Sequence, residues 1–295
     1  MNEHSAIDSW SFFAFCFFGV ISLPFSAAAA STSVVRWRML GPMTPLSDFA
    51  LPLEILFFIV GAVMGSFGNV VVFRSIAGKN LNGRSMCRAC GHVLSPLELV
   101  PVLSFLFLGA KCRACRMPIS WQYPLVEAAT GLLFLLSLWQ ESFILIPAFL
   151  LATALWLLLL ISLIDARTGS IPDALTIPFI GVSVMRALLL PSLPLLAMLI
   201  GGGFFALQWI ISRGRWVGSG DMLVGVGIGA LVLTGAQTFV SLGIAYIAGA
   251  IVAVLLLSTK RRTLGASLPF GPFLAFGALV TVFEGGWIVR LLMGS

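Results

Sequence analysis

The chain has 295 residues, of which 59% are hydrophobic and 9% are charged, and its formal net charge is +6. Soluble globular domains carry roughly 25% charged residues, so this chain has too few polar groups to cover a water-facing surface. The composition excludes a soluble enzyme, a disordered protein and a secreted disulfide scaffold. Several apolar runs approach the length of about 20 residues that a helix needs to cross a bilayer. We therefore expect an all-α fold, a polytopic membrane helix bundle embedded in lipid.

An N-terminal extension, residues 1–45, precedes the region that is easiest to interpret. Residues 10–30 are apolar enough to insert into a membrane, and the alanines at 28–30 resemble a small-residue cleavage site. The first four residues, however, lack the basic stretch of a signal peptide. A signal-like or dispensable extension is therefore favoured over a structural span.

Apolar runs separated by turn residues predict about eight membrane spans after this extension. They are expected at residues 52–73, 123–139, 144–164, 174–190, 193–211, 222–233, 238–257 and 270–292. This division leaves four connecting segments on one side, residues 74–122, 165–173, 212–221 and 258–269. Those segments hold 13 of the 17 basic residues. Because basic loops stay in the cytoplasm, we expect that side to be cytoplasmic.

Basic clusters can also indicate nucleic-acid binding. Here the clusters are short and lie between apolar spans, so no nucleic-acid partner is expected. The glycines within residues 61–65 and 225–229 are expected to mark close packing of helices.

The predicted cytoplasmic segment 74–122 contains two C-x-x-C pairs separated by 21 residues. The four cysteines are Cys87, Cys90, Cys112 and Cys115. Two such pairs are a strong signal for tetrahedral zinc, and four thiolates leave no coordination position open for water. The metal, zinc or another thiophilic ion, would therefore be structural and would fold the loop. Two disulfides or free thiols are the alternatives, although disulfides rarely persist in the cytosol. Cys16, in the extension, is expected to have no role.

Three aspartates lie where predicted spans end or begin. Asp165 follows the span 144–164, where a carboxylate would face the negative end of the helix dipole. Local structure therefore does not explain Asp165. Asp173 follows Pro172 and opens the next helix, where a role as N-cap is a sufficient explanation. Asp221 follows two glycines at the start of a later span, and both capping and function remain open for it.

Asp165 and Asp221 are predicted to lie at the same depth, at the cytoplasmic boundary. Two close carboxylates cannot both ionise cheaply, so they share a proton. One can then act as a base toward water while the other polarises a peptide carbonyl. Gly218 and Gly220 would allow backbone and substrate to approach closely. We therefore predict aspartyl-protease chemistry with Asp165 and Asp221 as the catalytic pair, and Glu127 as a secondary candidate.

Several motifs resemble, in order along the chain, those of the bacterial type IV prepilin peptidases. They are Gly65-Ser66-Phe67-Gly68-Asn69-Val70 ending at Arg74, the two cysteine pairs, Pro101-Val102-Leu103-Ser104, Ile119-Ser120 with Tyr123-Pro124 and Glu127, Asp165 with Ile171-Pro172-Asp173, Gly218-x-Gly220-Asp221, and Pro269-Phe270-Gly271-Pro272-Phe273. The resemblance runs from about residue 52 to the end. There are two departures, Leu223 where the family often has Lys, and Gly68 where it usually has a larger apolar residue.

The resemblance implies an inner-membrane aspartyl protease of the G-x-G-D type. Its substrates would be prepilins and the pseudopilins of type II secretion, cut after a glycine on the cytoplasmic face. Members with the four cysteines commonly also methylate the new N-terminal residue, with S-adenosylmethionine as the methyl donor. The implied organisation is a first membrane helix at 52–73, a four-cysteine loop at 74–122 and a membrane peptidase domain at 123–292. The alternatives are a peptidase without methyl transfer, and a non-catalytic zinc-loop scaffold or proton-coupled transporter.

Overall fold

The structure is a computed structural model that describes residues 50–190, 193–259 and 268–294. The extension of residues 1–45 and Cys16 lie outside this part, so the expectations for them stay predictions. The long helices of the described part are α3 (Ala50–Ile76), α5 (Gln122–Gln140), α6 (Leu145–Thr168), α7 (Asp173–Leu188), α8 (Leu195–Ser212), α9 (Ser219–Val232), α10 (Gly235–Ser258) and α11 (Gly271–Met293). Within those residues there is no strand longer than an isolated bridge. The all-helical bundle is therefore confirmed.

Five of these helices, α3, α6, α8, α10 and α11, are long and apolar enough to cross a membrane. The others are α5, α7 and α9, which also coincide with predicted spans. At 1.5 Å per residue the 14 residues of α9 cover only about 21 Å, less than the about 30 Å hydrocarbon thickness. The chain is a multi-pass membrane protein, and the exact number of spans stays a prediction.

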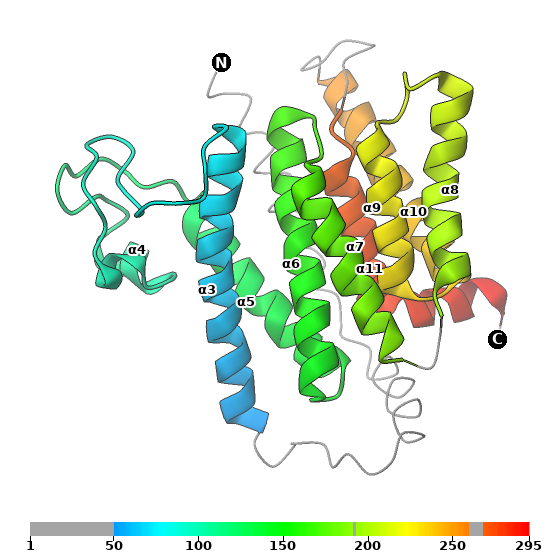
Figure 1. Ribbon diagram of the computed structural model, residues 1–295, viewed down its shortest axis with the longest axis horizontal. Coiled ribbons are helices and arrows are strands. Elements are labelled where there is room, and N and C mark those ends of the chain that lie inside the picture. Colours follow the sequence, from blue (N-terminus) through cyan, green and yellow to red (C-terminus); the bar gives the residue numbers. More distant parts are fainter. Residues whose placement is uncertain (1–49, 191–192, 260–267, 295) are drawn as a thin grey trace.

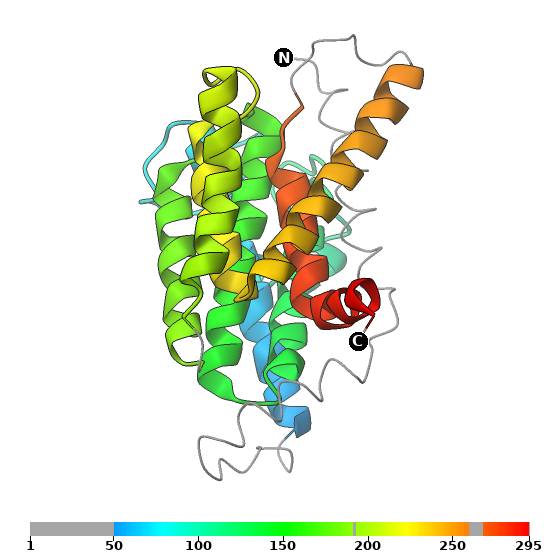
Figure 2. The same ribbon diagram turned by 90° about the vertical axis from the view of Figure 1, so that its right-hand side faces the viewer.

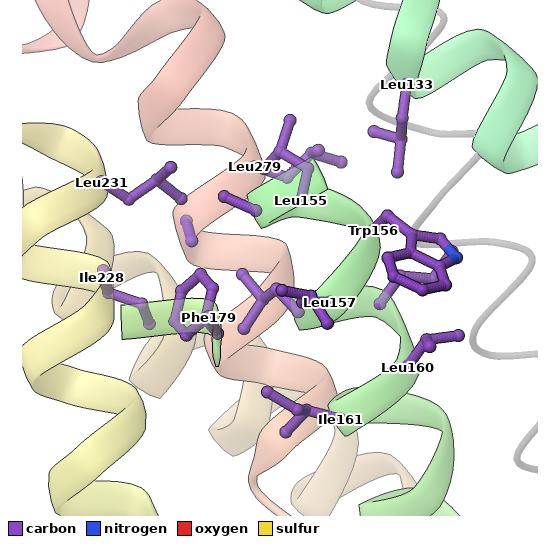
Figure 3. Packing of buried hydrophobic residues seen from close by; sticks show 14 of the residues in the cluster. Leu133, Leu155, Trp156, Leu157, Leu160, Ile161, Phe179, Ile228, Leu231 and Leu279 are labelled. Atoms are coloured by element: carbon purple, nitrogen blue, oxygen red, sulfur yellow. The ribbon is translucent and has the colours of Figure 1, made fainter. Parts of the chain in front are cut away.

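Helix α6 lies at the centre of the bundle and contacts α3, α5, α7 and α11. Its sequence is apolar on every side, which is the pattern of a helix surrounded by other helices. In its most apolar window 78% of the residues are buried, against 22% for α10 at the periphery. Figure 3 shows Leu155, Leu157 and Ile161 of this helix packed among side chains of the neighbouring helices.

Small residues allow the helices to pack closely at two contacts. A Cβ on Gly65 of α3 would lie 2.8 Å from the Glu127 Cα of α5, and a Cβ on Gly201 of α8 would lie 2.1 Å from the Gly225 carbonyl oxygen of α9. Neither contact could form with a larger residue, so the prediction of close helix packing is confirmed at Gly65 and Gly225.

One end of the bundle gathers the described parts of the segments that were predicted to be cytoplasmic. It carries the ends of α3 and α6, the starts of α7, α9 and α11, and the cysteine-containing segment between α3 and α5, as Figures 1 and 2 show. That segment contains the 3-10 helix Pro96–Leu99 and the short helix α4 (Leu103–Phe107). The fold thus brings both aspartate motifs to one end of the molecule.

Candidate functional site

Asp165 lies in the last turn of α6 with 4% of its surface exposed. Its Oδ2 accepts a hydrogen bond of 2.7 Å from the backbone N–H of Gly271, the first residue of α11. The first N–H groups of a helix lack partners within the helix and lie at its positive end. The N-terminus of α11 therefore compensates the unfavourable position that Asp165 has at the C-terminus of its own helix.

Asp221 is the third residue of α9 and is half-buried. Its Oδ2 accepts a hydrogen bond of 3.0 Å from the backbone N–H of Gly218, so this carboxylate caps the helix. The same carboxylate also interacts electrostatically with Asp165. The structure thus brings together the two aspartates that the sequence singled out, and capping does not prevent their approach.

Two glycines allow the aspartate-bearing segments to approach closely. A Cβ on Gly220 would lie 2.7 Å from the Cβ of Ile171, in the connection that follows Asp165. A Cβ on Gly271 would lie 2.8 Å from the Asp165 Oδ2. Side-chain atoms essentially never approach so closely, so glycine is required at both positions for this geometry. The second glycine of the Gly-x-Gly-Asp pattern is therefore a packing requirement of the site, whereas a Cβ on Gly218 would make only an ordinary contact, 3.5 Å from Asp221 Oδ2.

Asp173 differs from its predicted role. It is the first residue of α7, it is exposed, and no side-chain capping bond forms at that helix start. The N-cap position is occupied by Pro172, whose backbone is extended (φ −80°, ψ 122°). The prediction of an N-cap at Asp173 was therefore wrong by one residue. Its charge instead lies in the first turn, where the helix dipole favours it.

Two aromatic residues near the aspartates, Tyr246 and Phe205, were not singled out from the sequence, and both contact Phe270 of the last motif. The Tyr246 hydroxyl donates a 2.9 Å hydrogen bond to Gln208 Oε1, and its ring lies 4.8 Å from that of Phe270. Phe270 directly precedes Gly271, and its ring centre lies 6.2 Å from that of Phe205. Tyr246 also interacts electrostatically with Asp221. A tyrosine within an apolar span was the only available signal, and it does not indicate by itself which helices the ring would meet.

The four cysteines form two equivalent turns. In the first, the Cys87 N–H donates to the His92 carbonyl at 2.8 Å, and in the second the Cys112 N–H donates to the Met117 carbonyl at 2.9 Å. Each turn contains a residue with positive φ, Gly91 at 73° and Arg116 at 59°. The repeated C-x-x-C spacing therefore folds into two matching knuckles.

The knuckles bring the four thiol sulfurs within 4.8 Å of one another. The Cys87 and Cys115 sulfurs are 3.8 Å apart. Zinc–sulfur bonds of about 2.3 Å in a tetrahedron require sulfurs about 3.8 Å apart, so this cluster could hold a metal ion. All four cysteines are free thiols, which does not agree with the alternative of two disulfides.

The thiols of the cluster are electrostatically unequal. The backbone N–H groups of Cys90 and Ala89 lower the pKa of Cys87 to about 6, so its sulfur is a thiolate at neutral pH. At Cys115 the backbone N–H of Met117 acts in the same direction, but desolvation and the neighbouring sulfurs outweigh it and raise the pKa to about 12. Cys115 therefore stays a neutral thiol at neutral pH unless a cation lies beside it.

The first knuckle contacts the end of α3. The Arg88 guanidinium lies 3.1 Å from the centre of the Phe73 ring, and that ring stacks on Tyr123 at 5.5 Å. Arg167, two residues after Asp165, lies 5.4 Å from the same Phe73 ring. Its guanidinium also donates a hydrogen bond to Gln122. The first cysteine knuckle, through Arg88, and the aspartate-bearing end of α6, through Arg167, are therefore both packed against the Phe73 ring.

Glu127 is buried between α3, α5 and the cysteine-containing segment. Its Oε2 accepts a 2.7 Å hydrogen bond from the Val102 N–H. No hydrogen bond connects it with Asp165 or Asp221 in the part of the chain that the structure describes. Glu127 therefore anchors the loop that follows the first knuckle.

Fold and site together define a multi-pass membrane protein with two neighbouring carboxylates at one end and a four-thiol module beside them. Two family models match the chain, the bacterial peptidase A24 N-terminal domain at residues 59–141 and the type IV leader peptidase family at residues 152–257. This chain belongs to the type IV leader peptidase family.

Among its relatives are proteins named prepilin leader peptidase/N-methyltransferase. The one from Burkholderia pseudomallei is 35% identical over 86% of this chain and 93% of its own length. That from Pseudomonas aeruginosa is 31% identical over 83% of this chain and 97% of its own. The Myxococcus xanthus protein is 34% identical over 70% of this chain and 64% of its own. No solved structure matches the chain.

Proposed function

We propose that this chain cleaves the leader peptides of type IV prepilins and then methylates the new N-terminal residue. Membership in the leader peptidase family and the names of the relatives support both activities. The observation that carries the peptidase is the placement of the end of α6, with Asp165, and the start of α9, with Asp221, at one end of the bundle, where Gly220 packs on Ile171. Family membership also favours this function over the scaffold and transporter alternatives.

Asp165 and Asp221 are the proposed catalytic residues. The two carboxylates share one proton. The ionised carboxylate takes a proton from water, while the protonated one donates its proton to the scissile carbonyl oxygen. The water oxygen bonds to the carbonyl carbon and forms a tetrahedral diol. The carboxyl group that took the water proton then gives it to the leaving nitrogen, and a diol hydroxyl returns a proton to the other carboxylate as the peptide bond breaks. The Gly271 N–H holds Asp165 Oδ2 in place for this step. Leu223, where the family often has Lys, is half-buried and brings no charge to the start of α9.

The contact between α11 and Asp165 predicts the effect of a small substitution. In Gly271→Ala the added Cβ would lie 2.8 Å from Asp165 Oδ2, so the carboxylate or the helix has to move. We expect leader cleavage, measured as initial rate, to fall by about 10²-fold, the cost of a misplacement near 1 Å. Gly286→Ala on the same helix is the matched control, because a Cβ on Gly286 would have no neighbouring atom within 4 Å. Equal rates in the two variants would contradict this role of Gly271.

Zinc is the metal that we propose for Cys87, Cys90, Cys112 and Cys115. The sulfur spacing supports a closed tetrahedral shell, which suits a structural ion. Bound zinc would supply cross-linking of the two knuckles and no reactive coordination position. S-adenosylmethionine is proposed as methyl donor from the relatives' name alone, and its binding residues are not assigned.

The proposed location is the bacterial inner membrane, with the catalytic end of the bundle facing the cytoplasm. The predicted gathering of basic residues at that end supports this orientation. Prepilins and pseudopilins would then reach the aspartates from the cytoplasm, with their leaders cut after a glycine.

The test is to incubate the purified, lipid-reconstituted protein with a prepilin, with and without S-adenosylmethionine, and to weigh the products. We expect loss of the leader in both reactions and a gain of one methyl group only with the donor. Cleavage without a gain of a methyl group would indicate a peptidase that has no methyltransferase activity. An uncut prepilin would contradict the proposed function.

A further inference from the structure

The segment between the two knuckles has an apolar edge that faces outward. Glu98 is the only charged residue among residues 96–110, although the surrounding segment is rich in Lys and Arg. In α4, Leu106 and Phe107 are 64% and 86% exposed, while Phe105 is buried against the Trp121 ring at 4.9 Å. Single exposed apolar residues are ordinary, but a contiguous group on a small module indicates a contact surface.

The depth of this segment follows from its anchor on the bundle. Val102, which directly precedes α4, donates its N–H to Glu127 at 2.7 Å, and Glu127 packs on Gly65 of α3. Gly65 lies 11 residues before the end of α3 at Ile76, which is about 16 Å along the helix. Figure 1 shows α4 at the level of the middle of α3, well below its end. The segment therefore folds back along the bundle.

This level lies within the thickness of a bilayer. The 27 residues of α3 span about 40 Å, and a hydrocarbon core of about 30 Å centred on them leaves about 5 Å at each end. The level of Gly65 is then roughly 10 Å inside the hydrocarbon boundary on the side of the aspartates. Exposed residues of α3 near that level, such as Val63 and Phe67, are apolar as well. The apolar edge of α4 therefore continues the lipid-facing surface of α3.

The backbone of the segment suits an apolar environment. The N–H groups of Leu106, Leu108 and Ala110 donate to carbonyls of the same segment. Pro96 and Pro101 have no N–H to satisfy. Glu98 is turned inward, with 5% of its side chain exposed, and its Oε2 accepts the Ser95 N–H at 2.8 Å and faces His92 Nε2 at 3.6 Å. Its Oε1 and the Ser95 hydroxyl are buried without a hydrogen-bond partner among the described residues. Backbone at membrane depth has to satisfy its polar groups within the protein, and the backbone bonds of this segment do so around α4.

We propose that residues 96–108 are inserted into the leaflet that borders the end of the bundle carrying Asp165 and Asp221. Phospholipid acyl chains cover Leu106 and Phe107, and the basic residues of the same module suit anionic headgroups above them. The four-cysteine module is then held at the membrane surface beside the aspartates, where a membrane-bound substrate arrives. It is a membrane-attached element instead of a free loop in water.

The test uses the full-length protein in lipid nanodiscs with the photo-cross-linking residue p-benzoylphenylalanine at single positions. Position 107 tests the proposal, position 59 on the exposed side of α3 is the lipid control, and position 79, just after α3, is the water control. We expect phospholipid adducts at position 107 at a yield similar to position 59 and several-fold above position 79. If the label at position 107 impairs folding, position 106 is labelled instead. Folding of the module is judged from the amount of metal that the purified protein holds.

Adducts at position 107 no more frequent than at position 79 would overturn the proposal. Cross-links from position 107 to a second copy or to another peptide of this chain would do the same, because a protein would then cover the apolar edge. The expected result requires lipid at position 107 or 106 in a protein whose metal content matches that of the unlabelled chain.

Discussion

Asp165→Asn and Asp221→Asn are each expected to abolish leader cleavage. Asparagine preserves the size of the side chain and can still accept the bonds from Gly271 and Gly218, so insertion and folding should be retained. It cannot exchange the proton on which the proposed mechanism depends. Loss of a general acid–base group typically costs about 10²- to 10⁴-fold, and residues that act as a unit lose nearly everything when either is removed. Initial cleavage rates of a prepilin, followed by mass spectrometry, measure the effect.

Asp173→Asn is the matched control for these two substitutions. Asp173 also belongs to the resemblance to prepilin peptidases, but it is exposed and forms no capping bond in the first turn of α7. We expect its cleavage rate to stay near that of the wild type. Retained cleavage in either Asp165→Asn or Asp221→Asn would refute the paired-carboxylate mechanism.

Cys112→Ser is expected to remove the metal from the four-cysteine module and to unfold that module. Cys112 is the most buried of the four cysteines, at 6% exposed, and a serine hydroxyl is a poor replacement for a thiolate. The wild type should hold about one zinc per chain and the variant close to none. Because metal binding supplies much of the folding free energy of such small sites, residues 77–121 should become sensitive to limited proteolysis. Elemental analysis and peptide mapping measure both effects.

Methyl transfer in Cys112→Ser should fall at least as far as leader cleavage, whereas the helices around α6 should remain folded. Cys16→Ser is the control, since Cys16 lies outside the cluster in the N-terminal extension. Full metal content in Cys112→Ser would contradict the assigned ligands. A wild type without metal, whose four thiols are freely alkylated, would contradict the site altogether.

Asp165 has a hydrogen-bond partner that no local sequence pattern indicates. From the sequence, a carboxylate at the end of α6 is unfavourable, and this is why it was singled out as functional. The structure supplies a donor for it from α11, more than one hundred residues later in the chain. Helix α6 ends near its predicted position, but the partner of Asp165 depends on how α6 and α11 pack.

The sequence by itself determined the membrane bundle, the approximate helices, the two aspartate motifs and the four-thiol cluster. Hydrophobic length and C-x-x-C spacing act over short stretches of chain, so they can be seen without a fold. Only the tertiary structure decided that Gly271 donates to Asp165, that the Tyr246 ring packs on Phe270, and that α4 folds back along α3. These features depend on contacts between residues far apart in the chain. No local pattern encodes them, because each forms only when the packed helices fix the distance between its two partners.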